Sequence, residues 1–197
     1  MINETETIKS AQQGQLSAFN QLVMLHQGIA YNVAYRIMGD ADSAADATQE
    51  AFIKAFRSIE QYQGGMFRSW LMRIVTNTCY DQLRYHNRRP SEALESEAVE
   101  ADYTPHLIDP AEQPEETAVR HELGDMLQGA INRLQPDQRV VLILSDVEGF
   151  SYQEIAEITK ISLGTVKSRL NRARSRLRDI LQAQELLPSQ YRLKSDE

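Results

Sequence analysis

A run of acidic residues and prolines in the middle of the chain most constrains its fold. Residues 91–119 hold nine acidic residues, three prolines and no lysine or arginine. Like charges repel, proline interrupts helices, and the few apolar residues show no sustained period, so we expect a flexible acidic linker. The chain then divides into two small domains, residues 1–90 and 120–184, followed by a C-terminal tail at 185–197.

The linker also accounts for the net charge of the chain. All 197 residues together carry a formal charge of −7. Without the nine negative charges of the linker, about +2 is left for the two domains. The overall acidity therefore does not exclude a surface that binds nucleic acid.

Several classes of protein are disfavoured by what the sequence lacks. No apolar run reaches the roughly 18 residues that a membrane helix needs, and the N-terminus does not resemble a signal peptide, so we expect a cytoplasmic protein without membrane insertion. The single cysteine, Cys79, lies among apolar residues, which indicates a packed thiol. The histidines lack ligand spacing, and we find no phosphate-binding glycine loop and no nucleophile motif. We therefore expect no metal, no cofactor, no small-molecule substrate and no enzyme activity.

Both domains have the apolar spacing of helices. In the first, we predict one helix over residues 19–37, a second that buries residues between 44 and 59, and a third over 67–84. The second carries polar residues at three- and four-residue spacing, which is typical either of a binding surface or of a solvated face: Asp46, Gln49, Glu50, Lys54 and Arg57. No strand-like alternation is long enough to matter, so the predicted fold is all-α.

The second domain has the pattern of a helix-turn-helix. An amphipathic helix over residues 123–134 precedes another that starts at Pro136. Ser151 and Glu154 form a capping box at the start of a short helix, and Ser162 is a good N-cap for the last one. Two helices joined by a tight turn, the first of them short, predict a DNA-binding helix-turn-helix.

The last predicted helix has one apolar and one polar face. Val166, Leu170 and Ala173 fall in a narrow apolar stripe at about 100° per residue. Polar and basic residues that suit base edges and phosphates lie opposite or on its flanks: Lys167, Ser168, Asn171 and Arg172. A solvated face with surface arginines is the alternative, but the capped turn and the local concentration of positive charge favour DNA contact.

Three separated motifs resemble one family, the bacterial extracytoplasmic-function sigma factors. "DADSAADATQEAFIKAFRSI" and "FRSWLMRIVTNTCYDQLRYHNRR" resemble their region 2, and "GFSYQEIAEITKISLGTVKSRLNRARSRLR" resembles their region 4. The resemblance implies a subunit that binds core RNA polymerase and directs it to promoter DNA. It places minus-thirty-five contacts at Lys167, Ser168, Asn171 and Arg172, and polymerase contacts on the polar stripe of the second helix.

The resemblance places minus-ten recognition and melting on the third helix. The implied residues are Trp70, Asn77, Tyr80, Asp81, Arg84 and Arg88. Aromatic faces, amides and cations are what an unstacked base and displaced phosphates need. Trp70 also fits a core position, and both interpretations stay open. In the family a loop before this helix holds the flipped base; here "YQGGMF" is one residue shorter than the common form and lacks its acidic residue, so the preferred base stays undetermined.

Two further expectations follow from the resemblance, and one alternative stays open. An anti-sigma factor is an expected partner, and the acidic linker either enters the nucleic-acid channel of the polymerase or serves only as a tether. The alternative is a helix-turn-helix regulator that binds an operator without polymerase. That alternative leaves the polar residues from Asn77 to Arg88 unexplained.

Overall fold

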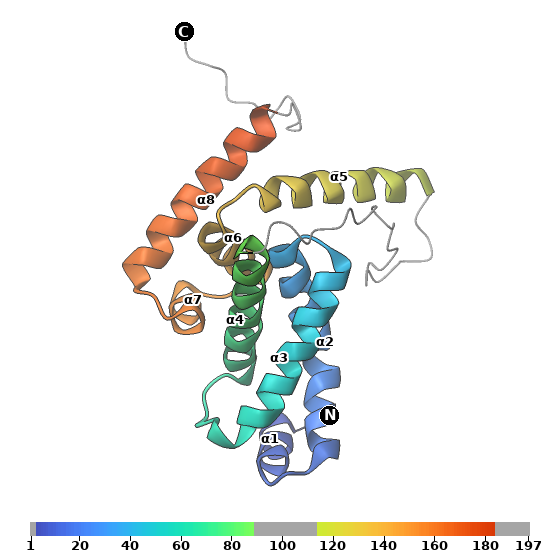
Figure 1. Ribbon diagram of the computed structural model, residues 1–197, viewed down its shortest axis with the longest axis vertical. Coiled ribbons are helices and arrows are strands. Elements are labelled where there is room, and N and C mark those ends of the chain that lie inside the picture. Colours follow the sequence, from blue (N-terminus) through green and yellow to red (C-terminus); the bar gives the residue numbers. More distant parts are fainter. Residues whose placement is uncertain (1–2, 89–113, 184–197) are drawn as a thin grey trace.

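The computed structural model describes residues 3–88 and 114–183 of the chain. These residues form helices and contain no strand, which confirms the all-α prediction. Figure 1 shows an N-terminal group of helices in blue to green, with a C-terminal group in yellow to red packed on it. Most of the expected linker, residues 91–113, and the expected tail, residues 185–197, lie outside the described residues.

Four α-helices form the N-terminal group, with a short 3-10 helix between the third and the fourth. They are α1 (Glu4–Gln12), α2 (Leu16–Met38), α3 (Ala41–Ser58), η1 (Ile59–Gln61) and α4 (Phe67–Arg88). Their core is built from the predicted apolar faces, and its fully buried members include Leu22, Val33, Ala51, Leu71 and Val75. Gly39 ends α2 with a φ of 91°, and the Asp40 side chain caps α3 by accepting from the Ser43 amide at 2.8 Å.

The first helix, α1, was not predicted from the sequence pattern, in which the first predicted helix begins at residue 19. Asn3 caps it, since its side-chain oxygen accepts from the Glu6 amide at 3.4 Å. Only Ile8 and Ala11 supply buried apolar side chains, and two apolar positions in nine residues give too weak a period to recognise. The packing of α1 against the rest of the domain therefore stabilises it.

The C-terminal group consists of four α-helices and one π-helical turn. They are α5 (Pro114–Asn132), α6 (Pro136–Leu142), η2 (Ile143–Val147), α7 (Tyr152–Thr159) and α8 (Leu163–Ala183). Pro136 occupies the first turn of α6, and Ser151 and Glu154 form the predicted capping box of α7. Ser162 accepts from the Thr165 amide at 3.1 Å, as expected of the cap of α8. The helix-turn-helix is thus α7 and α8.

Two expectations about α5 are corrected by the structure. The helix begins at Pro114, inside the segment expected to be linker, because proline suits the first turn of a helix although it breaks the interior of one. Leu123 and Leu127, which belong to the apolar face of the predicted amphipathic helix, are 53% and 36% exposed. The first half of α5 extends beyond the helices it would pack on (Figure 1), and the buried residues among those described, Gln128, Ala130 and Ile131, lie near its end.

The two domains pack directly on each other. The buried guanidinium of Arg139 on α6 donates to the carbonyl oxygen of Ile37 at the end of α2, and also to Asn132 and Leu134 of its own domain. Arg68 on α4 donates to the carbonyl oxygen of Glu148 at 3.0 Å and lies 4.3 Å from the centre of the Phe150 ring. These contacts hold α2 and α4 against the helix-turn-helix domain.

Candidate nucleic-acid and polymerase interfaces

The predicted DNA-reading face of α8 is exposed. Lys167, Ser168, Asn171 and Arg172 all lie on the solvent side of the helix. Val166, Leu170 and Ala173 are buried on the other side, with exposed fractions of at most 1%. Among the described residues, neither Lys167 nor Arg172 takes part in an ion pair within the chain. This face therefore presents cations, an amide and a hydroxyl together, as major-groove readout requires.

Two other arginines of α8 serve its own domain. Arg169 pairs with Asp137 of α6 at 2.6 Å. Arg174 binds both carboxylate oxygens of Asp146 through Nε and Nη2, at 2.8 and 2.6 Å, and this bond lowers the pKa of Asp146. The sequence shows a single basic stretch, but the structure separates it into arginines that fix α8 and cations that face solvent.

The turn before α8 sets the direction of the helix. Lys160 ends α7 in the left-handed conformation, with φ of 56°, and is the only described residue other than glycine with a positive φ. The chain reverses there and re-enters a helix at Leu163. The short α7 packs below α8, and in Figure 1 the two helices diverge from this turn. The N-terminal end of α8, which carries the polar face, is therefore at the edge of the molecule.

The residues predicted for minus-ten recognition lie on one face of α4 but in different surroundings. Asn77, Asp81 and Arg84 are exposed. Arg88 is the last residue of α4, and its side chain lies outside the described part. Trp70 is half-buried, with its ring 5.4 Å from Tyr62 and 5.3 Å from Phe67. It belongs to an aromatic cluster at the N-terminal end of α4.

Tyr80 is covered by the other domain. It lines a hollow of about 260 Å³ together with Arg84 of α4 and with Pro136 and Asp137 of α6. Burial, followed by the nearby charge of Asp137, raises the pKa of Tyr80. The C-terminal half of the α4 face is therefore in contact with the helix-turn-helix domain.

The polar stripe of α3 is divided by the structure. Glu50 pairs with Lys54 at 2.8 Å and accepts from Gln82 of α4 at 3.0 Å, and these bonds lower the pKa of Glu50. Lys54 also donates to Thr78 of α4 at 3.3 Å. Asp46, Gln49 and Arg57 are exposed. Part of the predicted polymerase-binding set thus joins α3 to α4.

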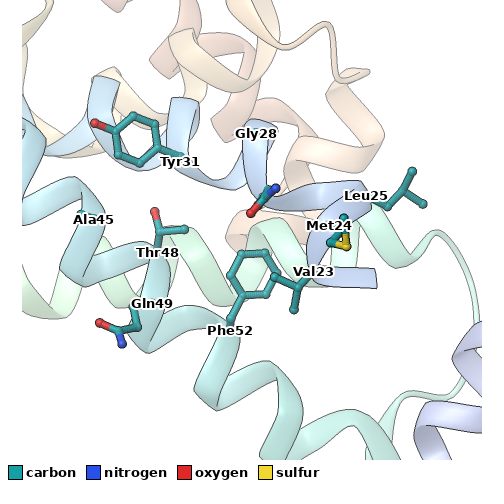
Figure 2. A pocket seen from close by; sticks show the side chains of 10 residues that line it. Val23, Met24, Leu25, Gly28, Tyr31, Ala45, Thr48, Gln49 and Phe52 are labelled. Atoms are coloured by element: carbon teal, nitrogen blue, oxygen red, sulfur yellow. The ribbon is translucent and has the colours of Figure 1, made fainter. Parts of the chain in front are cut away.

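An apolar groove between α2 and α3 was not predicted. It has a volume of about 600 Å³, and Figure 2 shows Val23 and Phe52 facing each other across it, with Gln49 and Thr48 on the α3 side. Met24 is 74% exposed beside it. Met24 and Leu25 could have indicated this groove from the sequence, because these two adjacent apolar residues do not fit the three- and four-residue spacing of the buried residues of α2. Gln49 alone of the predicted set lines this groove.

A second hollow, of about 780 Å³, lies beside the loop that precedes α4. Its wall includes Gly64 and Gly65, both with φ near +97°, a conformation that favours glycine. The opposite wall is α1, which contributes Glu4, Lys9 and Gln12. Because α1 was not predicted, sequence reasoning did not include its side chains among the candidate site residues.

The described residues offer no group of three or more side chains that could hold a metal ion. Cys79 is buried, and burial raises the pKa of its thiol to about 12. Within the described ranges no helix is long and apolar enough to cross a membrane.

Family models match both domains. The model described as "Sigma-70 region 2" matches residues 22–89, and "Sigma-70, region 4" matches residues 124–177. The first match contains α3 and α4, and the second contains α7 and the part of α8 up to residue 177. The helix α1 lies outside both matches.

Named relatives and a solved structure agree with these matches. The chain is 40% identical over 171 residues to the ECF RNA polymerase sigma factor SigE of Mycolicibacterium smegmatis, covering 86% of this chain and 63% of that relative. It is 35% identical to the RNA polymerase sigma-H factor of Pseudomonas aeruginosa, covering 91% of this chain and 94% of that one. The fold is similar to that of the sigma factor RpoE in complex with the anti-sigma factor NepR from Bartonella quintana, with a TM-score of 0.65, 28% identity and coverage of 85% and 98%.

Proposed function

The chain belongs to the extracytoplasmic-function sigma factors of the sigma-70 family, and we propose that its two domains divide promoter recognition between them. A sigma factor is a transcription initiation factor that binds core RNA polymerase and directs it to promoters. The region 2 match falls within residues 1–90 and the region 4 match within residues 120–184. This supports a division in which the first domain binds polymerase and the minus-ten element, and the second binds the minus-thirty-five element.

The exposed polar face of α8 carries the proposal for the minus-thirty-five element. In a helix-turn-helix the N-terminal residues of the second helix contact base edges in the major groove. Lys167, Ser168, Asn171 and Arg172 are exposed in the first three turns of α8. Arginine and lysine suit guanine, asparagine suits adenine, and serine contacts either.

The α4 face is the proposed reader of the minus-ten element. Asn77, Asp81 and Arg84 are exposed along it, and Arg88 follows at the end of the helix. Trp70 supplies aromatic surface at the N-terminal end of the face, and Tyr80 supplies it between Asn77 and Asp81. Strand opening needs stacking surfaces and cations for the displaced phosphates, and this residue set contains both.

Polymerase binding is proposed for α3 and the groove beside it. Asp46, Gln49 and Arg57 are exposed on α3, while Glu50 and Lys54 fix α3 on α4 and thereby position that surface. The apolar groove at Val23, Met24 and Phe52 adds a surface that a helix of the polymerase can cover. Exposed apolar side chains flanked by polar ones are typical of such contacts.

Promoter binding requires the two domains to part. The two elements are centred about 25 base pairs apart, or roughly 85 Å at about 3.4 Å per base pair. A helix of 21 residues such as α8 is only about 32 Å long at about 1.5 Å per residue. Two faces on domains in contact cannot reach both elements, so we propose that the linker lets the domains separate on DNA. Its acidity also suits the basic nucleic-acid channel of the polymerase.

The remaining expectations follow from the same function. A chain whose action is to bind polymerase and DNA needs no catalytic residues of its own, so we propose that it is not an enzyme. Because it acts on the chromosome together with polymerase, we propose a cytoplasmic location. The solved relative in complex with NepR supports an anti-sigma factor as a further partner.

Run-off transcription tests the proposal. Purified core polymerase is given a mixed genomic-fragment template with and without this protein, and the free protein is assayed for binding to the same DNA. Discrete new transcripts with little binding by the free protein are expected. Arg172→Ala should weaken initiation about 5- to 100-fold at promoters with an upstream element.

The control variant removes the same charge farther along the helix. Arg178→Ala changes an exposed arginine in the last turns of α8 and should have a much smaller effect. Tight DNA binding without polymerase and without new transcripts would instead support the independent regulator.

A further inference from the structure

The hollow beside the loop before α4 adjoins the proposed minus-ten face. The rings of Tyr62 and Phe67 line it, and both rings also contact Trp70 on α4. Lys9 and Arg68 lie at the same hollow and provide cations. A volume of about 780 Å³ with aromatic walls and nearby cations suits a planar ring attached to a phosphate chain.

The loop wall is held in place by α1. The Gln12 side-chain amide donates to the carbonyl oxygens of Tyr62 at 2.8 Å and Ile59 at 3.2 Å. The Tyr62 hydroxyl in turn donates to the carbonyl oxygen of Gly65 at 2.8 Å. A loop with two glycines is otherwise free to adopt many conformations. These three bonds give the hollow a defined shape before any ligand enters.

Glu4 of α1 is the only acidic side chain among the described residues that line the hollow. His26 lies 2.8 Å from Glu4 Oε1 through Nε2, and because a carboxylate only accepts, Nε2 carries the hydrogen. The His26 side chain is only 10% exposed, and its ring is 5.2 Å from that of Phe67, whereas the Glu4 side chain is 44% exposed. A buried, packed donor therefore fixes one oxygen of a carboxylate that is open to solvent.

The charge of Glu4 also acts on the aromatic wall. Burial and then the Glu4 charge raise the pKa of Tyr62. The loop itself, Gln63 to Met66, contains no acid. Among the described residues that line the hollow, the carboxylate thus comes from α1 and not from the loop.

Resting on the proposed function, we propose that Glu4 determines base specificity in minus-ten recognition. With Oε1 bound to His26, Oε2 can accept a hydrogen bond from the exocyclic amino group of a base extruded into the hollow. Glutamate accepting from the cytosine N4 amino group is an established pairing, whereas thymine presents a carbonyl oxygen at the same ring position. Two acceptors facing each other are unfavourable, so the hollow selects cytosine over thymine.

The test measures base preference with the complete holoenzyme. Run-off transcription is carried out on a promoter carrying cytosine or thymine at each minus-ten position of the non-template strand. The wild type should prefer cytosine at one position by about tenfold. Glu4→Gln keeps the shape but adds a donor, and it should reduce this preference to about twofold or less while transcription from the thymine promoter is retained.

Glu6→Gln is the matched control. Glu6 also lies in the first turn of α1, so both variants remove one negative charge near the same helix end, but Glu6 does not line the hollow. It should leave the cytosine preference unchanged. His26→Gln retains a donor toward Glu4 and should keep part of the preference, whereas His26→Ala should lower it. Thermal unfolding of each variant separates these effects from loss of the fold.

Each outcome decides one question. If Glu4→Gln leaves the cytosine preference unchanged, or if the wild type shows no such preference, the role of Glu4 is overturned. The proposed function stays intact in both cases, because transcripts are still made. Absence of any transcript with the wild type would overturn the proposed function, and with it this inference.

Discussion

The two helices proposed to read DNA, α4 and α8, are nearly equal in length, with 22 and 21 residues, but their surroundings differ. On α8 the residues from Lys167 to Arg172 that face away from the core are open to solvent. On α4, Arg68 and Tyr80 lie against the other domain. In this arrangement the minus-thirty-five reader is accessible, while the minus-ten reader is partly covered.

The α4 face is less accessible than the α8 face for a single reason, which is that the helix-turn-helix domain packs on α2 and α4. Arg139 joins α6 to the end of α2. Gly39 follows α2 directly, and a Cβ at this position would clash with the side-chain amide of Asn132. Arg68 binds the turn between η2 and α7. An element can thus have an ideal binding face and still need a domain movement to use it.

The largest effect is expected from Arg139. Arg139→Leu removes a buried donor that binds three carbonyl oxygens, two in its own domain and one in the other. We expect the free energy of unfolding to fall by about 2 to 4 kcal/mol. Denaturant unfolding measures it, with Arg178→Leu as the exposed control. An unchanged free energy would mean that these bonds do not hold the domains together.

A smaller effect is expected from the contact that covers the start of α4. Arg68→Ala removes the bond to Glu148 and the contact with the Phe150 ring, which together contribute about 1 kcal/mol. The domains should separate more often, and energy transfer between dyes on cysteines introduced at the exposed positions Asn20 and Ser175 should decrease.

The native Cys79 is buried with a raised pKa, so it should not react with the dyes. Arg57→Ala removes an arginine on α3 away from the interface and should leave the transfer unchanged. If Arg68→Ala has no more effect than Arg57→Ala, the difference between α4 and α8 does not depend on Arg68.

The smallest effect concerns α8 alone. Arg174 lowers the pKa of Asp146 below its ordinary value of 3.8. The ion pair therefore stabilises the fold at pH values above 3.8, and this stabilisation is lost as the pH falls through the lowered pKa of the folded state. Because both side chains are partly exposed, Asp146→Asn should cost about 1 kcal/mol or less at pH 6. The difference from wild type in urea unfolding should shrink as pH falls below 3.8 and vanish once the Asp146 carboxyl is protonated in the folded state.

Asp125→Asn, at an exposed site of α5, is the control for the change of charge. A difference for Asp146→Asn that persists at low pH would show that the ion pair is not its source.

Much of the fold was predictable because helix faces and caps are local. The buried stripe of α8 follows from residues three and four apart, and the capping box at Ser151 depends on two residues in one turn. The same rule missed α1, which has too few apolar positions, and it put Leu123 and Leu127 on the apolar face of a helix although the structure leaves both exposed. The spacing of apolar residues shows which side of a helix is apolar, but it does not show whether another element covers that side.

The sequence by itself determined two helical domains, a helix-turn-helix and the outward residues of α8, because each of these depends on spacing within a few residues. Only the tertiary structure decided that Arg169 and Arg174 fix α8, that Glu50 and Lys54 face α4, and that Glu4 meets His26. These contacts join residues far apart in the chain. Their distances depend on how helices pack, which short-range patterns do not encode.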